Sequence, residues 1–341
     1  MRTFLKQGFI GNQGVDRDAD FLPQEEIFLG LSGGADSLAL LGALAVEYPN
    51  VHALIVDHQL QKGSGEVAEK TAALARSIGV KATIIPVTVA PGNLEAQARI
   101  ARYQAFGKYT DKILLAHTRD DAAETLLMHL LRGHMQGLHP RSVVEGVTVF
   151  RPLLGIGREE TAGVCRELGW EPWQDPANFD PRFTRVRIRH EVLPLLADIA
   201  GPAATKNLAH AGNNIVEAQG LIHDQAVLFL RRYATKASSV SGIGIFTEEE
   251  RSVEGQTPAP TSNCALPISA LELLEPPIRL EVIALWLESE GVRLNGAVLR
   301  QVEALVSSWH GQGAVRVGKT GRVVGRIEGT LAIREEKDKG E

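Results

Sequence analysis

Cysteine is scarce in this sequence, and long apolar runs and zinc-type histidine spacings are absent. The 341 residues hold only two cysteines, Cys165 and Cys264, which are too few for a disulfide framework or a CxxC site. So low a cysteine content is typical of proteins from a reducing compartment, so we expect a cytoplasmic protein. The longest apolar stretch, Leu38 to Val46, is too short to cross a bilayer, so no membrane partner is expected. The ten histidines never form HExxH, which leaves zinc catalysis of that type without support.

An excess of basic charge is also missing. The formal net charge of -5 excludes a protein coated in basic residues, but binding to nucleic acid needs only a local basic patch. One such patch exists, because four arginines lie close together: Arg182, Arg185, Arg187 and Arg189. We expect this patch to bind nucleic-acid phosphates, with a solvated helix face as the plainer alternative. On a helix only Arg185 and Arg189 would share a face, so the four cannot all meet one ligand.

The first half of the chain alternates short apolar segments with helix-like ones. Strands are expected at 27–31, 51–57, 81–87 and 112–117, and helices at 36–47, 66–78, 93–109 and 120–132. Alternation of this kind predicts βαβ units. The expected fold class is α/β, with a Rossmann-like parallel sheet that carries helices on both faces.

The second half is less regular and predicts a helical second domain with a small mixed C-terminal part. A strand is expected at 147–154, an ordered loop at 170–182, helices at 158–168, 185–197, 202–233, 271–289 and 295–308, and short antiparallel strands within 314–333. The segment 236–266 is rich in Ser, Gly, Thr and Pro, which is typical of a linker or mobile loop.

A glycine-rich turn, Ser32-Gly33-Gly34-Ala35-Asp36-Ser37, joins the first strand to the first helix. Glycines let the backbone approach an anion, and the start of a helix offers unpaired N–H groups, so this turn is suited to phosphate. Asp36 would repel phosphate directly, which implies a bridging Mg²⁺ or a capping role. No lysine follows the glycines and no GxGxxG occurs, so neither a Walker A loop nor a dinucleotide site is expected. The bland alternative is an ordinary strand-to-helix turn.

Three acidic residues follow the fourth strand. Asp120, Asp121 and Glu124 lie one helical turn or less apart, with Asp121 and Glu124 on one face. Acidic residues favour helix N-termini, which alone would explain one or two of them. Three carboxylates at the carboxyl end of a strand, where open α/β sheets bind ligands, favour a site for a metal ion or an ammonium group.

Five strings occur in an order that resembles a known family. They are SGGADS at Ser32, VDHQL at Val56, GNLEAQARIARY at Gly92, AHTRDDAAETLLMHLLRG at Ala116 and DPANFDPRFTRVRIRHEVLP at Asp175. SGGADS is similar to the PP-loop signature of N-type ATP pyrophosphatases, and the set together resembles the tRNA(Ile)-lysidine synthetases. The resemblance is close over about residues 25–200 and looser beyond.

The resemblance implies a two-step reaction with ATP and Mg²⁺. ATP would adenylate the wobble cytidine of a tRNA(Ile) with a CAU anticodon, and L-lysine would then displace AMP. ATP would bind at Ser32, Gly33, Gly34, Ala35, Asp36 and Ser37, with Mg²⁺ at Asp36. Asp121 and Glu124 would contact lysine, and Arg99 would be catalytic. The patch Arg182, Arg185, Arg187 and Arg189 would meet tRNA or other phosphates. The resemblance leaves open whether the protein forms a homodimer.

The resemblance also implies a division of the chain. We expect a lead-in at 1–24, a PP-loop ATP-binding catalytic domain at 25–200, a helical extension at 201–235, a mobile linker at 236–267 and a C-terminal tRNA-binding part at 268–341. Gln59, Thr118 and Val186 depart from the family's usual residues, which are glycine, histidine and asparagine.

Other functions remain as alternatives. A tRNA thiolase of the same superfamily would need cysteines beside the motifs, and the two cysteines lie elsewhere. A small-molecule amidotransferase-type ligase would leave the arginine patch unexplained. A non-catalytic ATP-sensing or RNA-binding module would predict a degraded turn or acidic helix, and both strings are intact.

Overall fold

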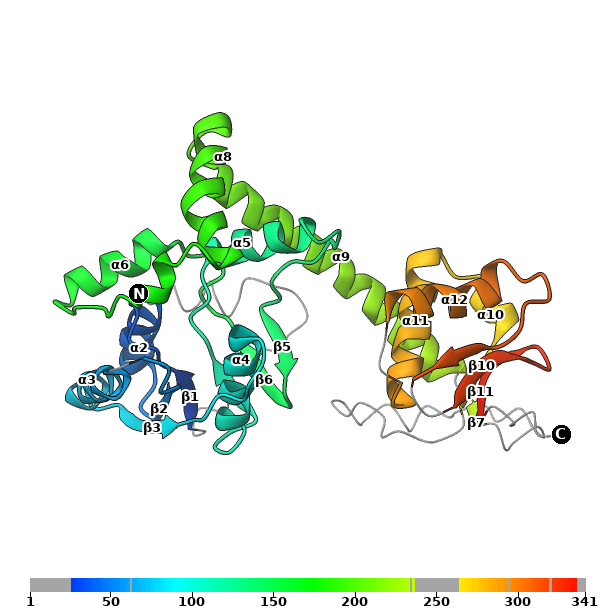
Figure 1. Ribbon diagram of the computed structural model, residues 1–341, viewed down its shortest axis with the longest axis horizontal. Coiled ribbons are helices and arrows are strands. Elements are labelled where there is room, and N and C mark those ends of the chain that lie inside the picture. Colours follow the sequence, from blue (N-terminus) through cyan, green and yellow to red (C-terminus); the bar gives the residue numbers. More distant parts are fainter. Residues whose placement is uncertain are drawn as a thin grey trace. The chain divides into compact units, whose positions relative to one another are not determined.

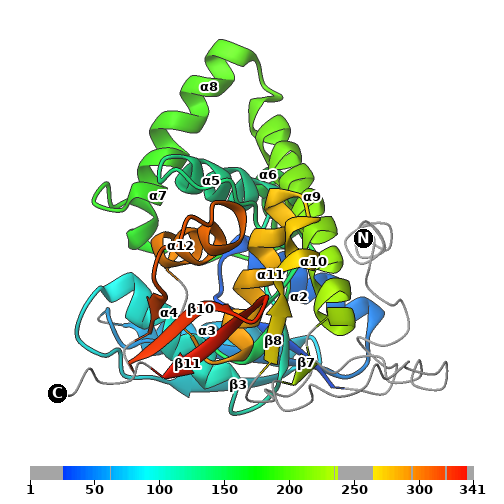
Figure 2. The ribbon, with the colours of Figure 1, turned by 90° about the vertical axis from the view of Figure 1, so that its right-hand side faces the viewer.

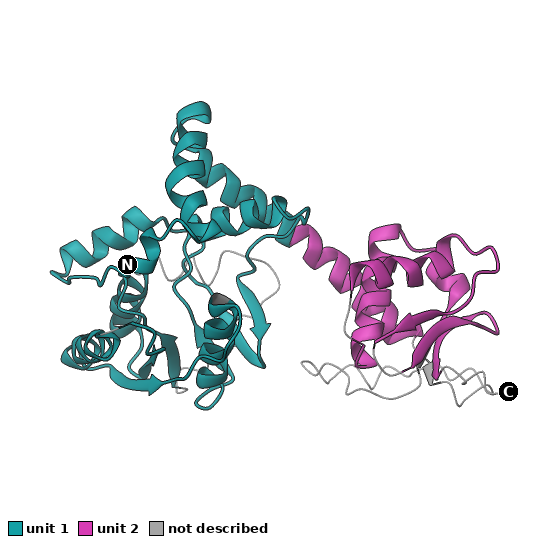
Figure 3. Cartoon of the chain, viewed as in Figure 1, with its two compact units in different colours: residues 1–216 teal, residues 217–341 magenta. Residues whose placement is uncertain are grey.

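The computed structural model describes residues 26–61, 63–233, 235–236, 264–292, 295–318 and 321–335, so the expected lead-in and residues 237–263 of the expected linker lie outside it. The chain divides into two compact units, coloured separately in Figure 3. Unit 1 ends at Val216 and unit 2 begins at Glu217. The boundary falls inside one long helix, α9 (Ala204–Tyr233). Within the described chain, no helix is long and apolar enough to cross a membrane.

Unit 1 is built on a six-stranded sheet with the order β3-β2-β1-β4-β6-β5. Its strands are β1 (Ile27–Gly30), β2 (Val51–Asp57), β3 (Lys81–Pro86), β4 (Lys112–Leu114), β5 (Arg141–Val144) and β6 (Val147–Phe150). All neighbours pair in parallel except β5, which is an antiparallel edge strand beside β6. The predicted α/β fold with a parallel sheet is confirmed.

Helices cover both faces of this sheet, and strand β2 shows how the chain supplies two cores. The helices are α2 (Ala35–Glu47), α3 (Ser64–Ser77), α4 (Leu94–Phe106), α5 (Arg119–Leu130) and α6 (Arg158–Glu167), labelled in Figure 1. Side chains alternate along a strand. Ala53 and Ile55 therefore join the core with residues of α2 and α3, whereas Leu54 packs with Tyr103 and Phe106 of α4.

Strand β5, which forms a hairpin with β6, is the part of the sheet that the sequence did not predict. The two-residue turn of this hairpin is Glu145-Gly146, with φ of 49° and 80°. Both values are positive, which matches the turn type that joins twisted antiparallel strands. The expected strand at 147–154 is present but ends at Phe150, because residues 151–156 turn toward α6.

A helical segment completes unit 1, and its first part is less regular than predicted. The expected helix at 185–197 is divided into α7 (Thr184–Arg187), a π-helical turn η2 (Ile188–Val192) and α8 (Leu193–Ala200). Before it, a short 3₁₀ turn η1 (Pro176–Phe179) interrupts the expected loop. Figures 1 and 2 show α5 beside this segment, and α5 contacts both α7 and η2.

Unit 2 has its own core between three helices and an antiparallel sheet. Its strands follow the order β7-β8-β11-β10-β9, and Figure 2 shows β8, β10 and β11 near helices α10–α12. Its elements are β7 (Thr235–Lys236), β8 (Cys264–Pro267), α10 (Ile268–Glu272), α11 (Pro276–Ser289), α12 (Gly296–Ser307), β9 (Val315–Val317), β10 (Arg322–Ile327) and β11 (Thr330–Glu335). The fully buried Trp286 lies in this core, as do Ala226 and Phe229 from the end of α9.

Three expectations that concern unit 2 need correction. The single helix expected at 271–289 is two helices, because Pro276 and Pro277 cannot continue a helix and instead begin α11. The linker expected up to residue 267 ends earlier, because Cys264–Pro267 pairs with β11 as strand β8. The helical extension expected at 201–235 is shared between the units, since the last turns of α9 belong to the core of unit 2.

Candidate active site

The glycine-rich turn joins β1 to α2 and is stabilised by hydrogen bonds among its own residues. The Ser37 hydroxyl donates to the Gly34 carbonyl at 3.0 Å and accepts from the Ser32 N–H at 3.2 Å. Gly33 has φ of 84°, and a Cβ there would lie 2.5 Å from the Thr71 hydroxyl, so glycine is required. The N-cap residue of α2 is Gly34, and among the described residues no side-chain hydrogen bond caps this helix. The first N–H groups of this helix therefore remain available to an anion.

Asp36 in the first turn of α2 is linked to α6. Its carboxylate accepts a hydrogen bond from the fully buried Thr161 hydroxyl and lies 3.8 Å from Arg158 Nε. Burial raises the pKa of the Asp36 carboxyl above its usual value. A nearby cation would reverse this effect, so the position is suited to a positively charged partner.

Asp36 also fits a magnesium ion that arrives with a nucleotide. Among the described residues, no three His, Cys, Asp or Glu side chains are grouped so that they could hold a metal ion. Mg²⁺ commonly takes one or two carboxylates and completes its shell with phosphate oxygens and water. Asp36 beside the phosphate-type turn is a donor set of this kind, in which the ion would neutralise phosphate charge.

The start of α5 is capped by its own side chains. Thr118 accepts from the Asp121 N–H, and the Asp121 carboxylate accepts from the Thr118 N–H at 2.7 Å and from its hydroxyl at 2.9 Å. Threonine at this departure from the family pattern therefore serves as an N-cap. Asp120 accepts from the backbone N–H of Arg158 at 3.0 Å, which ties α6 to α5.

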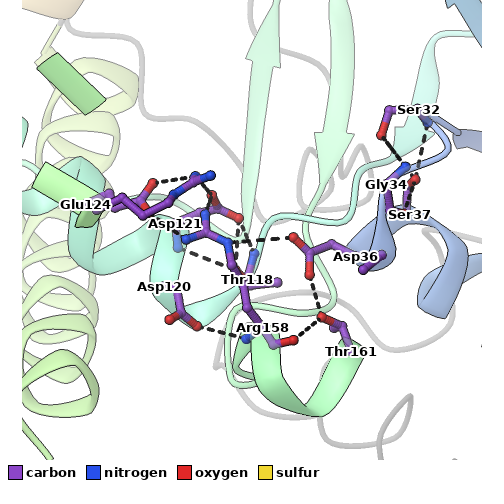
Figure 4. Close-up of polar contacts among 12 residues, drawn as sticks. Ser32, Gly34, Asp36, Ser37, Thr118, Asp120, Asp121, Glu124, Arg158 and Thr161 are labelled. Atoms are coloured by element: carbon purple, nitrogen blue, oxygen red, sulfur yellow. Dashed lines mark hydrogen bonds and ion pairs between the residues drawn. The ribbon is translucent and has the colours of Figure 1, made fainter. Parts of the chain in front are cut away.

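Two acidic side chains of α5 are enclosed by three arginines, and we call these five residues the acid–arginine cluster: Asp121, Glu124, Arg158, Arg185 and Arg189. Glu124, which has no exposed surface, accepts from Arg158 Nη1 at 2.6 Å, Arg185 Nε at 2.7 Å and Arg189 Nε at 2.8 Å. Asp121 accepts from Arg158 Nη2 at 2.6 Å and from Arg185 Nη2 at 3.1 Å. Figure 4 shows Arg158 between Asp36 on one side and Asp121 and Glu124 on the other.

The arginines decide the charge state of the two acids. Burial raises the pKa of Asp121, but the guanidiniums of Arg158 and Arg185 outweigh it, and this pKa lies well below the usual range. Burial acts on Glu124 in the same direction, yet hydrogen bonds from Arg189 and Arg158 hold its pKa below the usual value. Both side chains are carboxylates at neutral pH.

An open pocket of about 860 Å³ lies at the carboxyl ends of β1, β2 and β4, where open α/β sheets bind ligands. The glycine-rich turn supplies Ser32, Asp36 and Ser37 to its wall. Arg185 and Arg189 also line it, whereas Asp121 and Glu124 do not, so the arginines stand between the carboxylates and the pocket. No cysteine is among the described lining residues, and Cys165 is buried with its thiol donating to the Ala35 carbonyl.

His117 lies on the same pocket wall, at the end of β4. Burial lowers the pKa of this imidazole to about 3, so it is neutral at physiological pH. Its Nδ1 has no hydrogen-bond partner among the described residues. A neutral imidazole with a free nitrogen can donate to or accept from a polar ligand group, depending on its tautomer.

The structure brings some of the predicted site residues together and leaves others apart. Arg185 and Arg189, whose spacing predicted a shared helix face, both contact Glu124. Arg182 reaches the pocket wall while pairing with Asp180. Arg187 instead points to solvent and pairs with Glu191 at 2.8 Å. Arg99, expected to be catalytic, is not brought to the pocket, because it is exposed and stacks on Tyr103 at 4.9 Å.

Three residues of the site were not foreseen from the sequence. Arg102, one helical turn beyond Arg99, lines the pocket in its place. Arg158 and Thr161 come from α6, which lies outside every recognised string. Their only sequence signal is a polar residue in the first turn of a helix, which is too common to single out a site.

Taken together, the features define a class of enzyme domain. A parallel sheet whose first strand leads through SGGADS into a helix, with the pocket beside that turn, is a PP-loop nucleotide-binding domain. A family model described as PP-loop domain matches residues 11–196. A second model, described as TilS substrate binding domain, matches residues 266–331 in unit 2.

Comparison with curated proteins narrows the class to one family. The tRNA(Ile)-lysidine synthase of Corynebacterium glutamicum is 39% identical over 89% of this chain and 87% of its own length. The enzyme of the same name from Rhodococcus opacus is 41% identical over 87% of this chain and 84% of its own. That of Mycobacterium bovis is 42% identical over 90% of both. The chain belongs to the tRNA(Ile)-lysidine synthase family.

Proposed function

We propose that this protein ligates L-lysine to carbon 2 of the wobble cytidine in a tRNA(Ile) with a CAU anticodon, at the expense of ATP. One observation carries the proposal: the phosphate-type turn and two arginines of the acid–arginine cluster line the same open pocket, in a chain of this family. The reaction would take place in the cytoplasm, where tRNA is found.

The turn would bind ATP. The free N–H groups at the start of α2, with the Ser32 and Ser37 hydroxyls, are suited to the phosphates. Asp36 would hold Mg²⁺, which supplies electrostatic stabilisation of the charge that develops on the phosphates. Thr161 keeps the Asp36 carboxylate in place by its hydrogen bond.

The first step would join ATP to the cytidine. The oxygen on carbon 2 of the base attacks the α-phosphorus, a phosphorus–oxygen bond forms, and the bond to the β-phosphate breaks, which releases pyrophosphate. Charge builds on phosphate oxygens in this step, so fixed cations stabilise it. Arg185 and Arg189 on the pocket wall are such cations, and the carboxylate of Glu124 keeps both in position.

The second step would join lysine to the activated base. The ε-amine of lysine loses a proton, its nitrogen bonds to carbon 2, and the carbon–oxygen bond breaks, which releases AMP. Asp121 and Glu124 remain carboxylates at neutral pH, so they can attract the ammonium form. A carboxylate near the amine can also accept the proton that must leave.

Unit 2 would hold a more distant part of the tRNA. Arg300 and Arg316 are exposed there, and Arg326 stacks on Trp309 at 5.2 Å. Two further basic residues of the C-terminal part, Arg293 and Lys319, lie outside the described residues. Basic and aromatic side chains are suited to RNA, because they can contact its phosphates and bases.

The test uses purified protein, ATP, radiolabelled lysine and two tRNA(Ile) transcripts. One transcript carries the CAU anticodon, and its control carries uridine at the wobble position. We expect ATP-dependent label in the first transcript only, with pyrophosphate and AMP formed in equal amounts. Release of pyrophosphate with no lysine in the tRNA would instead point to another PP-loop tRNA-modifying enzyme.

A further inference from the structure

The two carboxylates that would receive lysine are already saturated with donors. Asp121 accepts two bonds from Thr118 and two from Arg158 and Arg185. Glu124 accepts one bond each from Arg158 and Arg185 and two from Arg189. A carboxylate offers about four acceptor positions, so neither side chain has one left. A lysine ammonium can reach this pair only if an arginine leaves it.

Arg158 is the arginine whose departure would open a place of the right kind. Its guanidinium bridges the two acids, with Nη1 at 2.6 Å from Glu124 Oε1 and Nη2 at 2.6 Å from Asp121 Oδ1. A bound lysine ammonium would be a positive group in the same position, between these two carboxylate oxygens. Arg185 and Arg189 would still compensate the buried charge of Glu124.

Arg158 is also the cluster member that lies near the glycine-rich turn. Its Nε lies 3.8 Å from Asp36, while its backbone N–H is tied to Asp120 at 3.0 Å. The backbone is therefore anchored, and the partly exposed side chain is held by hydrogen-bonded ion pairs with Asp121 and Glu124. A triphosphate beside Asp36 would offer this guanidinium a doubly accepting, highly charged partner of the type that arginine prefers.

We propose that Arg158 is a tethered stand-in for the lysine ammonium, which keeps the lysine site closed until a nucleotide occupies the phosphate turn. Binding would then be ordered, with nucleotide first and lysine second. Without nucleotide, the arginine adds to the compensation of the two buried carboxylates by bridging Asp121 and Glu124. The inference rests on the proposed function, since that function assigns lysine to Asp121 and Glu124.

The test measures lysine affinity by calorimetry, with and without Mg²⁺ and α,β-methylene-ATP, which cannot be cleaved between those phosphates. In the wild-type protein we expect the analogue to tighten lysine binding at least about tenfold, within the usual range of coupling between sites. By reciprocity, lysine should tighten binding of the analogue by the same factor.

Variants of Arg158 separate this role from a structural one. Arg158→Ala should bind lysine tightly without the analogue, and the coupling should fall below about threefold. Arg158→Lys keeps a tethered cation and should retain the closed site. Arg166→Ala removes the same charge from an exposed position on the same helix and should behave as wild type.

Two results would overturn the proposal. One is a wild-type lysine affinity that the analogue does not change, a measurement that needs no variant to fold. The other is a folded Arg158→Ala protein that binds lysine no better than wild type without the analogue, which would make the cluster purely structural. Lysine transfer to tRNA by the wild-type protein is measured separately. Its absence refutes the proposed function, whereas its presence with either result refutes only the role of Arg158.

Discussion

Glu124→Gln removes one negative charge from the centre of the acid–arginine cluster and keeps the size of the side chain. The glutamate accepts four hydrogen bonds from three arginines and has no exposed surface. In glutamine one oxygen becomes an NH₂ donor, so about half of these bonds become contacts between donors. Each hydrogen bond to a charged group contributes about 1.5–3 kcal/mol, and loss of one partner of a buried ion pair costs about 3–5 kcal/mol. We therefore expect unit 1 to lose about 3–5 kcal/mol of stability.

The assay must report unit 1 alone, because the two units need not unfold together. Hydrogen exchange of the α5 amides in increasing urea provides this local free energy of unfolding. Glu191→Gln is the matched control, since Glu191 makes an exposed ion pair with Arg187. Its expected loss is much smaller, because solvent screens an exposed ion pair. A loss below about 1 kcal/mol for Glu124→Gln would refute the reasoning, because the cluster would then not behave as a buried ionic network.

Four further predictions follow from the same structure. Asp36→Ala should abolish pyrophosphate release while the urea unfolding curve is kept, and near wild-type release would contradict its role at the phosphates. Arg189→Ala should lower tRNA affinity or cytidine activation, whereas exposed Arg187→Ala should reduce the salt slope of tRNA binding by at most about one unit; equal, wild-type behaviour of both variants would make the patch a solvated face. His117 has a folded pKa of about 3, below its unfolded value, so its contribution to stability is present above about pH 6.5 and is lost as the pH falls. Urea unfolding at about pH 7.5 and pH 5 should therefore differ by about 2 kcal/mol less in His117→Gln than in wild type, and an unchanged difference would contradict the burial of this group. A chain that ends at Val216 should bind ATP but lose affinity for full-length tRNA, and filter binding at wild-type strength would assign tRNA recognition to unit 1.

The sequence predicts the central strands of the unit 1 sheet well because strands such as β2 and β4 are largely buried and read as apolar runs between turns. The edge strand β5 lacks this signal, since Arg141 and Val143 face solvent and only the Glu145-Gly146 turn marks the hairpin. The break before α11 was missed for a different reason. The apolar pattern continues across Pro276 and Pro277, so helical periodicity alone does not reveal the break.

The sequence predicts most members of the site, but it predicts their arrangement only where one string supplies a whole function. The phosphate turn is local, so SGGADS predicts its position and its geometry. The acid–arginine cluster is not local, because Arg158 is 34 positions from Glu124 and belongs to α6, which packs against α2. Helical spacing could have favoured Arg102 over Arg99, since the two point about 60° apart, but not without knowing which face of α4 is buried.

The central claim is that one pocket activates a wobble cytidine and then joins lysine to it. The most direct test is mass spectrometry of nucleosides from tRNA(Ile) that has been incubated with the protein, ATP and lysine. The account predicts that the wobble cytidine gains the mass of lysine less one water, and that Asp36→Ala gives no such nucleoside. Unmodified cytidine after complete turnover of ATP, or lysine attached at any other nucleotide, would contradict it.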